Sequence, residues 1–213
     1  MNRTDHSLRL SHRYVEALDY AREQHAAQTR KGTNIPYLSH LIGVSALVLD
    51  HGGDEEQAIA ALLHDVIEDC GARHEAVVRE RFGDRVATIV LACTDGTEES
   101  KAEAATDEEK REAWRRRKLV YIEHLRDESD DALLVSCCDK LHNARAIVGD
   151  IEDPKVGLAV FDRFTAGRDG TLRYYHSVSD VFTRRGVSAA RALDAVVARM
   201  HELAGAQVRA GLA

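Results

Sequence analysis

The residues best suited to chemistry lie in the segment AALLHDVIEDC, residues 60–70. His64 and Asp65 follow four apolar residues, and Glu68 comes four positions after His64, so one helical turn would bring the three side chains to one side. Ionisable groups beside an apolar run need a partner, because burying an unpaired charge is costly. A divalent cation is such a partner, since imidazole and carboxylate are ordinary ligands of zinc, manganese and iron. The segment therefore predicts a metal site, with a solvated helix end as the plain alternative.

Two more polar side chains stand at the edges of apolar stretches. His40 lies in PYLSHLIGV, and Asp139 lies in LLVSCCDKLHNARAI with Asn143 one turn later. Taken alone, a histidine on an apolar face is usually a satisfied core residue, and an aspartate within a helix is usually at the surface. Together with His64 and Asp65, they are better explained as the ligands of one metal site than as four unrelated polar residues.

Helical periodicity dominates the chain and must position these groups, because strand-type alternation is nearly absent. Helices are expected over about 11–29, 40–50, 55–69, 74–81 and 84–92, from 108, from 130, and over 160–181 and 187–208. Residues 30–37 are expected to form a loop, and the acidic stretch 95–112 a mobile loop. The prediction is an all-α, bundle-like fold in a single domain over 1–213, with its core at about 11–185.

Composition excludes several classes of function. The 213 residues are 44% hydrophobic, enough for a buried core, and the net charge of −7 disfavours nucleic-acid binding. The apolar runs are all shorter than the roughly 18 residues of a membrane span, and the first residues do not resemble a signal peptide. The four cysteines have no C-x-x-C spacing, which indicates reduced thiols and a cytoplasmic protein.

Four segments, in this order, resemble a known family: RKGTNIPYLSH (30–40), LLHDVIEDC (62–70), RFGDRV (81–86) and CDKLHNARAI (138–147). The pattern H…HD…D is the ligand pattern of the HD phosphohydrolase superfamily. The fuller set is similar to the hydrolase domain of RelA/SpoT-type alarmone enzymes, and most of all to the small single-domain alarmone hydrolases. The resemblance is close over about 14–92 and 118–148, and it implies an HD-domain helical bundle.

The resemblance also implies a reaction and a set of site residues. One Mn²⁺ ion per chain, or another divalent metal, would be held by His40, His64, Asp65 and Asp139. Glu68 and Asp69 match an acidic pair beside the metal-bound water, and Asn143 would orient ligand or water. The implied activity is hydrolysis of (p)ppGpp at the phosphorus nearest the ribose 3′ oxygen, which releases pyrophosphate and leaves GDP or GTP.

The candidate substrate-binding residues are Arg30, Lys31, Lys118, Lys140, Arg168 and Tyr175. Arg30 and Lys31 match a basic pair on the family's substrate loop, where arginine can stack on a base while lysine meets phosphate. Arg168 is placed to reach a distal 5′-phosphate, with Tyr174 or Tyr175 against the base. Lys140 has an alternative role, which is to neutralise nearby carboxylates.

The sequence is compatible with three hypotheses of function. The first is the (p)ppGpp hydrolase, and the second is an HD phosphohydrolase of another nucleotide, either the adenine alarmone (p)ppApp or the 2′-phosphate of NADPH. The third is a non-catalytic nucleotide-binding HD module. The expected partner is a small nucleotide, with no nucleic acid and no membrane, and the chain is expected to be a monomer or a homodimer.

Overall fold

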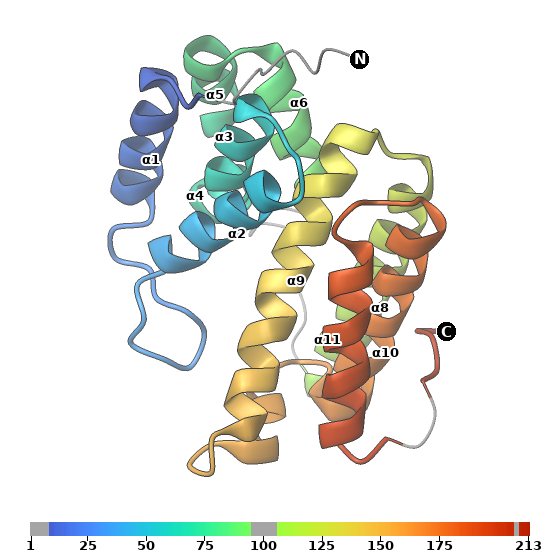
Figure 1. The fold of residues 1–213 in the computed structure, drawn as a ribbon. Coiled ribbons are helices and arrows are strands. Elements are labelled where there is room, and N and C mark those ends of the chain that lie inside the picture. Colours follow the sequence, from blue (N-terminus) through green and yellow to red (C-terminus); the bar gives the residue numbers. More distant parts are fainter. Residues whose placement is uncertain (1–8, 95–105, 207–208) are drawn as a thin grey trace.

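The computed structural model describes residues 9–94, 106–206 and 209–213, and over these ranges the chain folds into α-helices joined by short connections (Figure 1). In chain order the elements are α1 (His12–Gln24), α2 (Leu38–Asp50), α3 (Glu55–Leu63), α4 (Val66–Cys70), α5 (His74–Phe82), α6 (Asp84–Cys93), α8 (Asp107–Asp127), α9 (Asp130–Glu152), the 3₁₀ helix η1 (Gly157–Arg163), α10 (Gly167–Arg184) and α11 (Ala190–Leu203). The predicted all-α class is confirmed. Among the described helices, none combines the length and apolar character needed to cross a membrane.

Helix α9 runs through the middle of the molecule (Figure 1). Helices α2, α3 and α6 pack on it from one side, and α10 and α11 pack on it from the other, with α8 against α10. The α3 run from Ala58 to Leu63 is completely buried in this core. The polar pair that follows this run is therefore placed at the end of a fully buried helix.

Side-chain caps fix where several helices begin. Asp54 accepts a hydrogen bond from the backbone N–H of Gln57, whose side chain in turn accepts from the backbone N–H of Asp54. Thr106 and Glu109 form the same reciprocal capping box at the start of α8. Capping boxes satisfy N–H groups that the first helical turn leaves unpaired.

The chain departs from the predicted helix 55–69 at the His64–Asp65 pair. Helix α3 ends at Leu63 and α4 begins at Val66, so the pair occupies a break between two helices. The buried ring of His64 donates from Nδ1 to the carbonyl of Ala61 at 2.9 Å, and so satisfies one of the last acceptors of α3. Helix propensity alone did not show this break, because every residue of the segment is compatible with a continuous helix.

Other boundaries also differ from the prediction. Helix α8 begins at Asp107, one residue before the expected start at 108, so only the assignment of a loop as far as 112 is wrong; three acidic residues of this first turn face the positive end of the helix dipole. The part of the predicted loop over 95–105 lies outside the described residues. The first helix ends at Gln24 and not near 29, the segment 160–181 is split into η1 and α10, and the last helix covers only Ala190–Leu203 of 187–208.

Candidate metal centre and adjoining cavity

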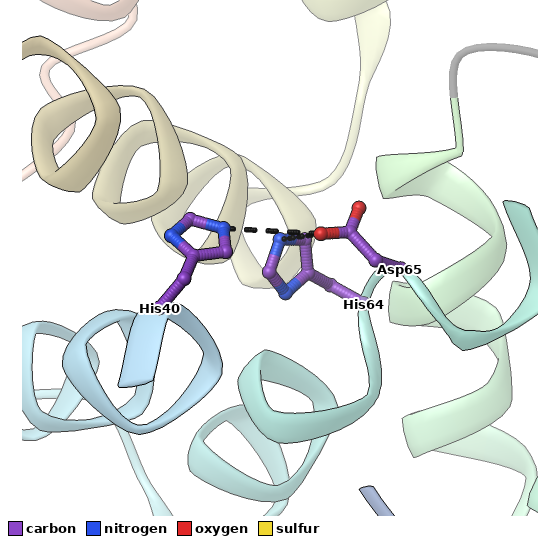
Figure 2. A group of neighbouring side chains, drawn as sticks. All are labelled: His40, His64 and Asp65. Carbon is purple, nitrogen blue, oxygen red and sulfur yellow. Dashed lines mark ion pairs between the residues drawn. The ribbon is translucent and has the colours of Figure 1, made fainter. Parts of the chain in front are cut away.

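Three parts of the fold bring four polar side chains together. His40 comes from the first turn of α2, His64 and Asp65 from the α3–α4 junction, and Asp139 from the middle of α9. Figure 2 shows that the rings of His40 and His64 both turn toward the carboxylate of Asp65. His40 Nε2 lies 3.8 Å from Asp65 Oδ2 and 3.2 Å from Asp139 Oδ1. His64 Nε2 lies 3.0 Å and 3.6 Å from the same two oxygens.

The hydrogen bonding of the two rings leaves one nitrogen of each without a partner. His64 Nδ1 bonds to the Ala61 carbonyl, and His40 Nδ1 lies 2.9 Å from Nδ1 of His142. Both Nε2 atoms are buried, and among the described residues neither has a hydrogen-bond partner, although carboxylate oxygens lie nearby. Buried polar atoms are rarely left in this state. Two unpartnered imidazole nitrogens facing two carboxylates fit a divalent cation, since this donor set suits zinc, manganese or iron.

Both carboxylates are held in the ionised form that a cation requires. Burial opposes ionisation of Asp139, but Lys140 Nζ lies 2.6 Å from Oδ2, and together with the two imidazoles it holds the pKa of Asp139 well below its usual range. Burial likewise opposes ionisation of Asp65, yet His64 lowers the pKa of that carboxyl. Two charged acceptors therefore face the two rings.

The two histidines respond differently to the same surroundings. Burial lowers the pKa of His40, against the opposing effect of Asp139. Burial also acts against a charge on His64, but Asp65 and Asp139 outweigh it and raise the pKa of His64 well above its usual value. At both rings the two carboxylates favour positive charge, as a cation-binding site requires, while burial opposes it.

Neutral donors orient the two carboxylates. Asn143 Nδ2 donates to Asp139 Oδ1 at 2.6 Å, and the Tyr37 hydroxyl donates to Asp65 Oδ2 at 2.5 Å. Burial and the neighbouring Asp65 raise the pKa of Tyr37, so the hydroxyl keeps its proton. Contacts of this kind fix the direction of first-sphere ligands in metalloproteins.

A cavity of about 500 Å³ adjoins the cluster. Tyr37 and Asn143 line it, and each is bonded to one of the clustered carboxylates, so the cavity opens directly beside them. Three of the predicted substrate-binding residues also line it: Arg30, Lys31 and Tyr175. A concave site with three cationic side chains in its wall, Arg30, Lys31 and Arg163, next to paired carboxylates suits a phosphorylated small molecule.

The other predicted site residues lie elsewhere. Lys140 is largely but not fully buried and pairs with Asp139, with Nζ 5.0 Å from the centre of the Tyr121 ring, which agrees with its alternative role as a local counter-charge. Lys118 Nζ lies 5.1 Å from the centre of the Tyr174 ring. Arg168 is 44% exposed at the start of α10, beside Asp169, and is not among the described residues that line the cavity.

The acidic pair that follows the His64–Asp65 break lies on the short helix α4. Glu68 and Asp69 are half-buried, and Asp69 Oδ2 accepts a hydrogen bond from Gln28 Nε2 at 2.8 Å. Neither is among the described residues that line the cavity. The structure thus places Glu68 one turn from Asp65 and ties Asp69 to the segment before the Arg30 loop.

Three residues of the site were not identified from the sequence: Tyr37, His142 and Arg163. Tyr37 and His142 stand inside the segments PYLSH and DKLHN, but their targets are on other helices, so spacing alone does not reveal them. Arg163 lines the cavity, pairs with Asp150 at 2.6 Å, and packs so closely on Gly32 that a Cβ there would lie 2.7 Å from Arg163 Cδ. In the sequence, only Gly32 in the RKGT segment relates to this contact, because it leaves the space that Arg163 fills.

Comparison with known proteins places this site in a family. The HD domain family model matches residues 17–172. The chain is 35% identical over 134 residues to a guanosine-3′,5′-bis(diphosphate) 3′-pyrophosphohydrolase MESH1 from Xenopus tropicalis, and the match covers 62% of this chain and 67% of that protein. It is 36% identical over 132 residues to a guanosine-3′,5′-bis(diphosphate) 3′-pyrophosphohydrolase from Aquifex aeolicus, but spans only 17% of that protein's length.

A solved structure extends the similarity beyond the aligned sequence segments. That protein is described as a metazoan ortholog of SpoT that hydrolyzes ppGpp. The two folds match with a TM-score of 0.71 at 28% identity, over 94% of this chain and 99% of the other. A match over 94% of the chain extends past residue 172, where the match to the family model ends.

Proposed function

The chain belongs to the HD domain family, and we propose that it is a metal-dependent 3′-pyrophosphohydrolase of guanosine 3′,5′-bis(diphosphate). The substrate is chosen from the activity named for the MESH1 relatives and for the ppGpp hydrolase of known structure. One observation carries the proposal. Two buried imidazole Nε2 atoms without hydrogen-bond partners among the described residues face two ionised carboxylates at the edge of a cationic cavity.

The proposed metal ligands are His40, His64, Asp65 and Asp139, and the proposed cofactor is one Mn²⁺ ion per chain. When bound, a divalent cation would lower the pKa of a coordinated water and offset charge on phosphoryl oxygens. The two carboxylates, already ionised and held in place by Tyr37 and Asn143, need no rearrangement to receive it.

The remaining residues of the site bind the substrate and move the proton. We assign Arg30 and Lys31 to the phosphate groups, because they are cations in the cavity wall. Tyr175, which is buried in the same wall, offers a ring face to the base. Glu68 is proposed to accept the proton of the attacking water, one turn from Asp65, and Asp69 to support it. In-line attack then forms a bond from the water oxygen to the phosphorus nearest the ribose 3′ oxygen and breaks the bond between that phosphorus and the 3′ oxygen; the 3′ oxygen takes up a proton from solvent, which leaves GDP and releases pyrophosphate.

We propose that residues 1–213 act as one HD hydrolase domain, since the matched structure extends over almost the whole chain. The four cysteines have no C-x-x-C spacing, which supports a reducing compartment, and we propose the cytoplasm.

A nucleotide panel tests the proposed substrate. The purified protein with Mn²⁺ is given ppGpp, ppApp and NADPH separately at one concentration, and products are identified by chromatography. The proposal predicts pyrophosphate and GDP from ppGpp at the highest rate. Faster release of phosphate from NADPH, or of pyrophosphate from ppApp, would show that ppGpp is not the preferred substrate. Binding without turnover would show that the protein is a nucleotide-binding module and not an enzyme.

Two glutamate variants test the assigned proton acceptor. Glu68→Gln is expected to lower kcat at least about 100-fold while Mn²⁺ binding is retained, because general-base catalysis typically contributes that much. Glu75→Gln is the matched control, since Glu75 pairs with Arg79 on α5 and has no place in the proposed reaction. A full rate in Glu68→Gln would remove this residue from the mechanism.

A further inference from the structure

His142 makes a contact that the proposed reaction does not use. It lies on α9, three residues after Asp139, and its Nδ1 is 2.9 Å from Nδ1 of His40 on α2. The two rings meet edge to face, with centroids 4.8 Å apart and planes at 60°. One turn of α9 therefore supplies Asp139, its donor Asn143 and the neighbour of His40.

The ring chemistry of His40 defines the direction of this bond. If Nε2 of His40 binds a cation, it must offer a lone pair, and the proton of the neutral ring must then be on Nδ1. Nδ1 of His40 therefore donates, and Nδ1 of His142 accepts. His64 reaches the same state by a different partner, because its Nδ1 donates to the backbone carbonyl of Ala61.

The backbone of α2 holds the His142 ring in place. A Cβ built on Gly43 would lie 2.2 Å from Nε2 and 2.4 Å from Cδ2 of His142, far closer than atoms can approach. Gly43 is one turn after His40 on the same helix, so the helix that carries His40 also provides the space that the partner ring fills. The ring of His142 is thus packed against α2 as well as bonded to it.

We propose that His142 is a positioning residue for the metal centre: it accepts the Nδ1–H of His40 and so aims Nε2 of His40 at the cation. The inference rests on the metal site of the proposed function. Outer partners of ligating histidines fix the tautomer and orientation of the ring, and their loss typically lowers metal affinity roughly 10- to 100-fold.

The experiment is titration of the chelator-treated full chain with Mn²⁺ by calorimetry, with thermal unfolding measured in the same metal-free buffer. His142→Leu removes the acceptor and should weaken Mn²⁺ binding about 10- to 100-fold. His142→Asn keeps an acceptor near the position of Nδ1 and should restore most of the affinity. His201→Leu is the matched control, because the buried ring of His201 bonds through Nε2 to the Leu172 carbonyl, so its loss affects stability but not Mn²⁺ affinity.

A second variant tests the same contact from the other helix. Gly43→Ala should displace the His142 ring and weaken Mn²⁺ binding, and it should do so less in a His142→Asn background, where the shorter side chain leaves room for the new methyl group. This coupling distinguishes ring displacement from general damage to α2.

The outcomes separate this inference from the function it rests on. Wild-type protein that binds no Mn²⁺ would overturn both the metal centre and the positioning role. Tight binding by wild type and equally tight binding by His142→Leu would overturn the positioning role alone. Equal losses in His142→Leu and His142→Asn would overturn the hydrogen bond as its basis.

Discussion

Lys140 offers the sharpest test of how charge is balanced around the cluster. Its side chain is 13% exposed and that of Asp139 is 9% exposed, with Nζ 2.6 Å from Oδ2. Lys140→Met keeps most of the chain length and removes the charge. Breaking a buried pair by removing one partner costs about 3–5 kcal/mol. Asp139 keeps its bond from Asn143, so we expect the lower end, about 3 kcal/mol, or a fall in Tm of roughly 6–12 °C for a domain of this size.

The assay is thermal and urea unfolding of wild type and Lys140→Met, first with chelator and then with saturating Mn²⁺. A bound cation would supply positive charge beside Asp139, so Mn²⁺ should stabilise the variant more than the wild type and recover part of the loss. Lys118→Met is the control. Lys118 also lies over the ring of Tyr121, whereas the ion pair with Asp139 is made by Lys140. The expected effect of Lys118→Met is small and the same with and without Mn²⁺.

Two results would refute this reasoning. A Lys140→Met protein as stable as wild type in chelator would mean that Asp139 does not depend on Lys140 for its charge balance. An equal gain from Mn²⁺ in both proteins would mean that the cation does not bind near Asp139.

Three further predictions concern the cavity, an ion-pair network and the core. Lys31→Ala should raise KM for ppGpp about tenfold with little change in kcat, as measured by steady-state kinetics, because it removes a contact that the ground state also makes. Arg85→Met should cost about 1 kcal/mol at pH 7 by urea unfolding, since Arg85 pairs with three partly exposed carboxylates. Arg85 lowers the pKa of Asp131, so this cost should persist above the unfolded pKa of about 3.9 and disappear as the pH falls through the lower folded value. Phe82→Ala, at a fully buried site, should lose about 3–5 kcal/mol in the same assay, and a loss below 1 kcal/mol would contradict the packing described here.

Much of the helical fold could be predicted from the sequence, because its signals are local. The capping box at Asp54 and the periodicity of α9 depend only on neighbours within a turn or two. The break at His64–Asp65 could not be predicted in this way. It accompanies the turn of the His64 ring to the Ala61 carbonyl inside the packed core. The end of the acidic loop was placed as far as 112 because the stretch has no apolar face, although a helix was expected from 108; the cap and the helix dipole stabilise this first turn of α8.

The four proposed metal ligands could be predicted from residue type and sequence position, but not every group that orients them could. His40, His64, Asp65 and Asp139 were singled out by their places beside apolar runs, and the structure brings Nε2 of each histidine within 4 Å of an oxygen of each carboxylate. Asn143, which orients Asp139, lies one turn away on the same helix, but Tyr37 and His142 reach their partners from segments distant in sequence. The hydrogen bond between His40 and His142 joins residues 102 positions apart, and sequence spacing predicts contacts only within a few turns of one helix.

Charged residues show the same limit of sequence reasoning. Arg168 was singled out for a distal phosphate by its neighbours in the chain; the structure places it 44% exposed at the start of α10, outside the described residues of the cavity wall, and its role stays a prediction. Arg163, which has no motif of its own, is part of that wall because η1 folds back onto the RKGT segment. The direction in which a long cationic side chain points is decided by tertiary packing.

The most direct test of the central claim is the rate of pyrophosphate release from ppGpp by the purified chain, with Mn²⁺ and then with excess chelator. The account predicts release with Mn²⁺, one GDP for each pyrophosphate, loss of the rate in chelator and recovery when Mn²⁺ is restored. A rate that survives complete removal of the metal, or the absence of release from protein shown to hold Mn²⁺, would contradict it.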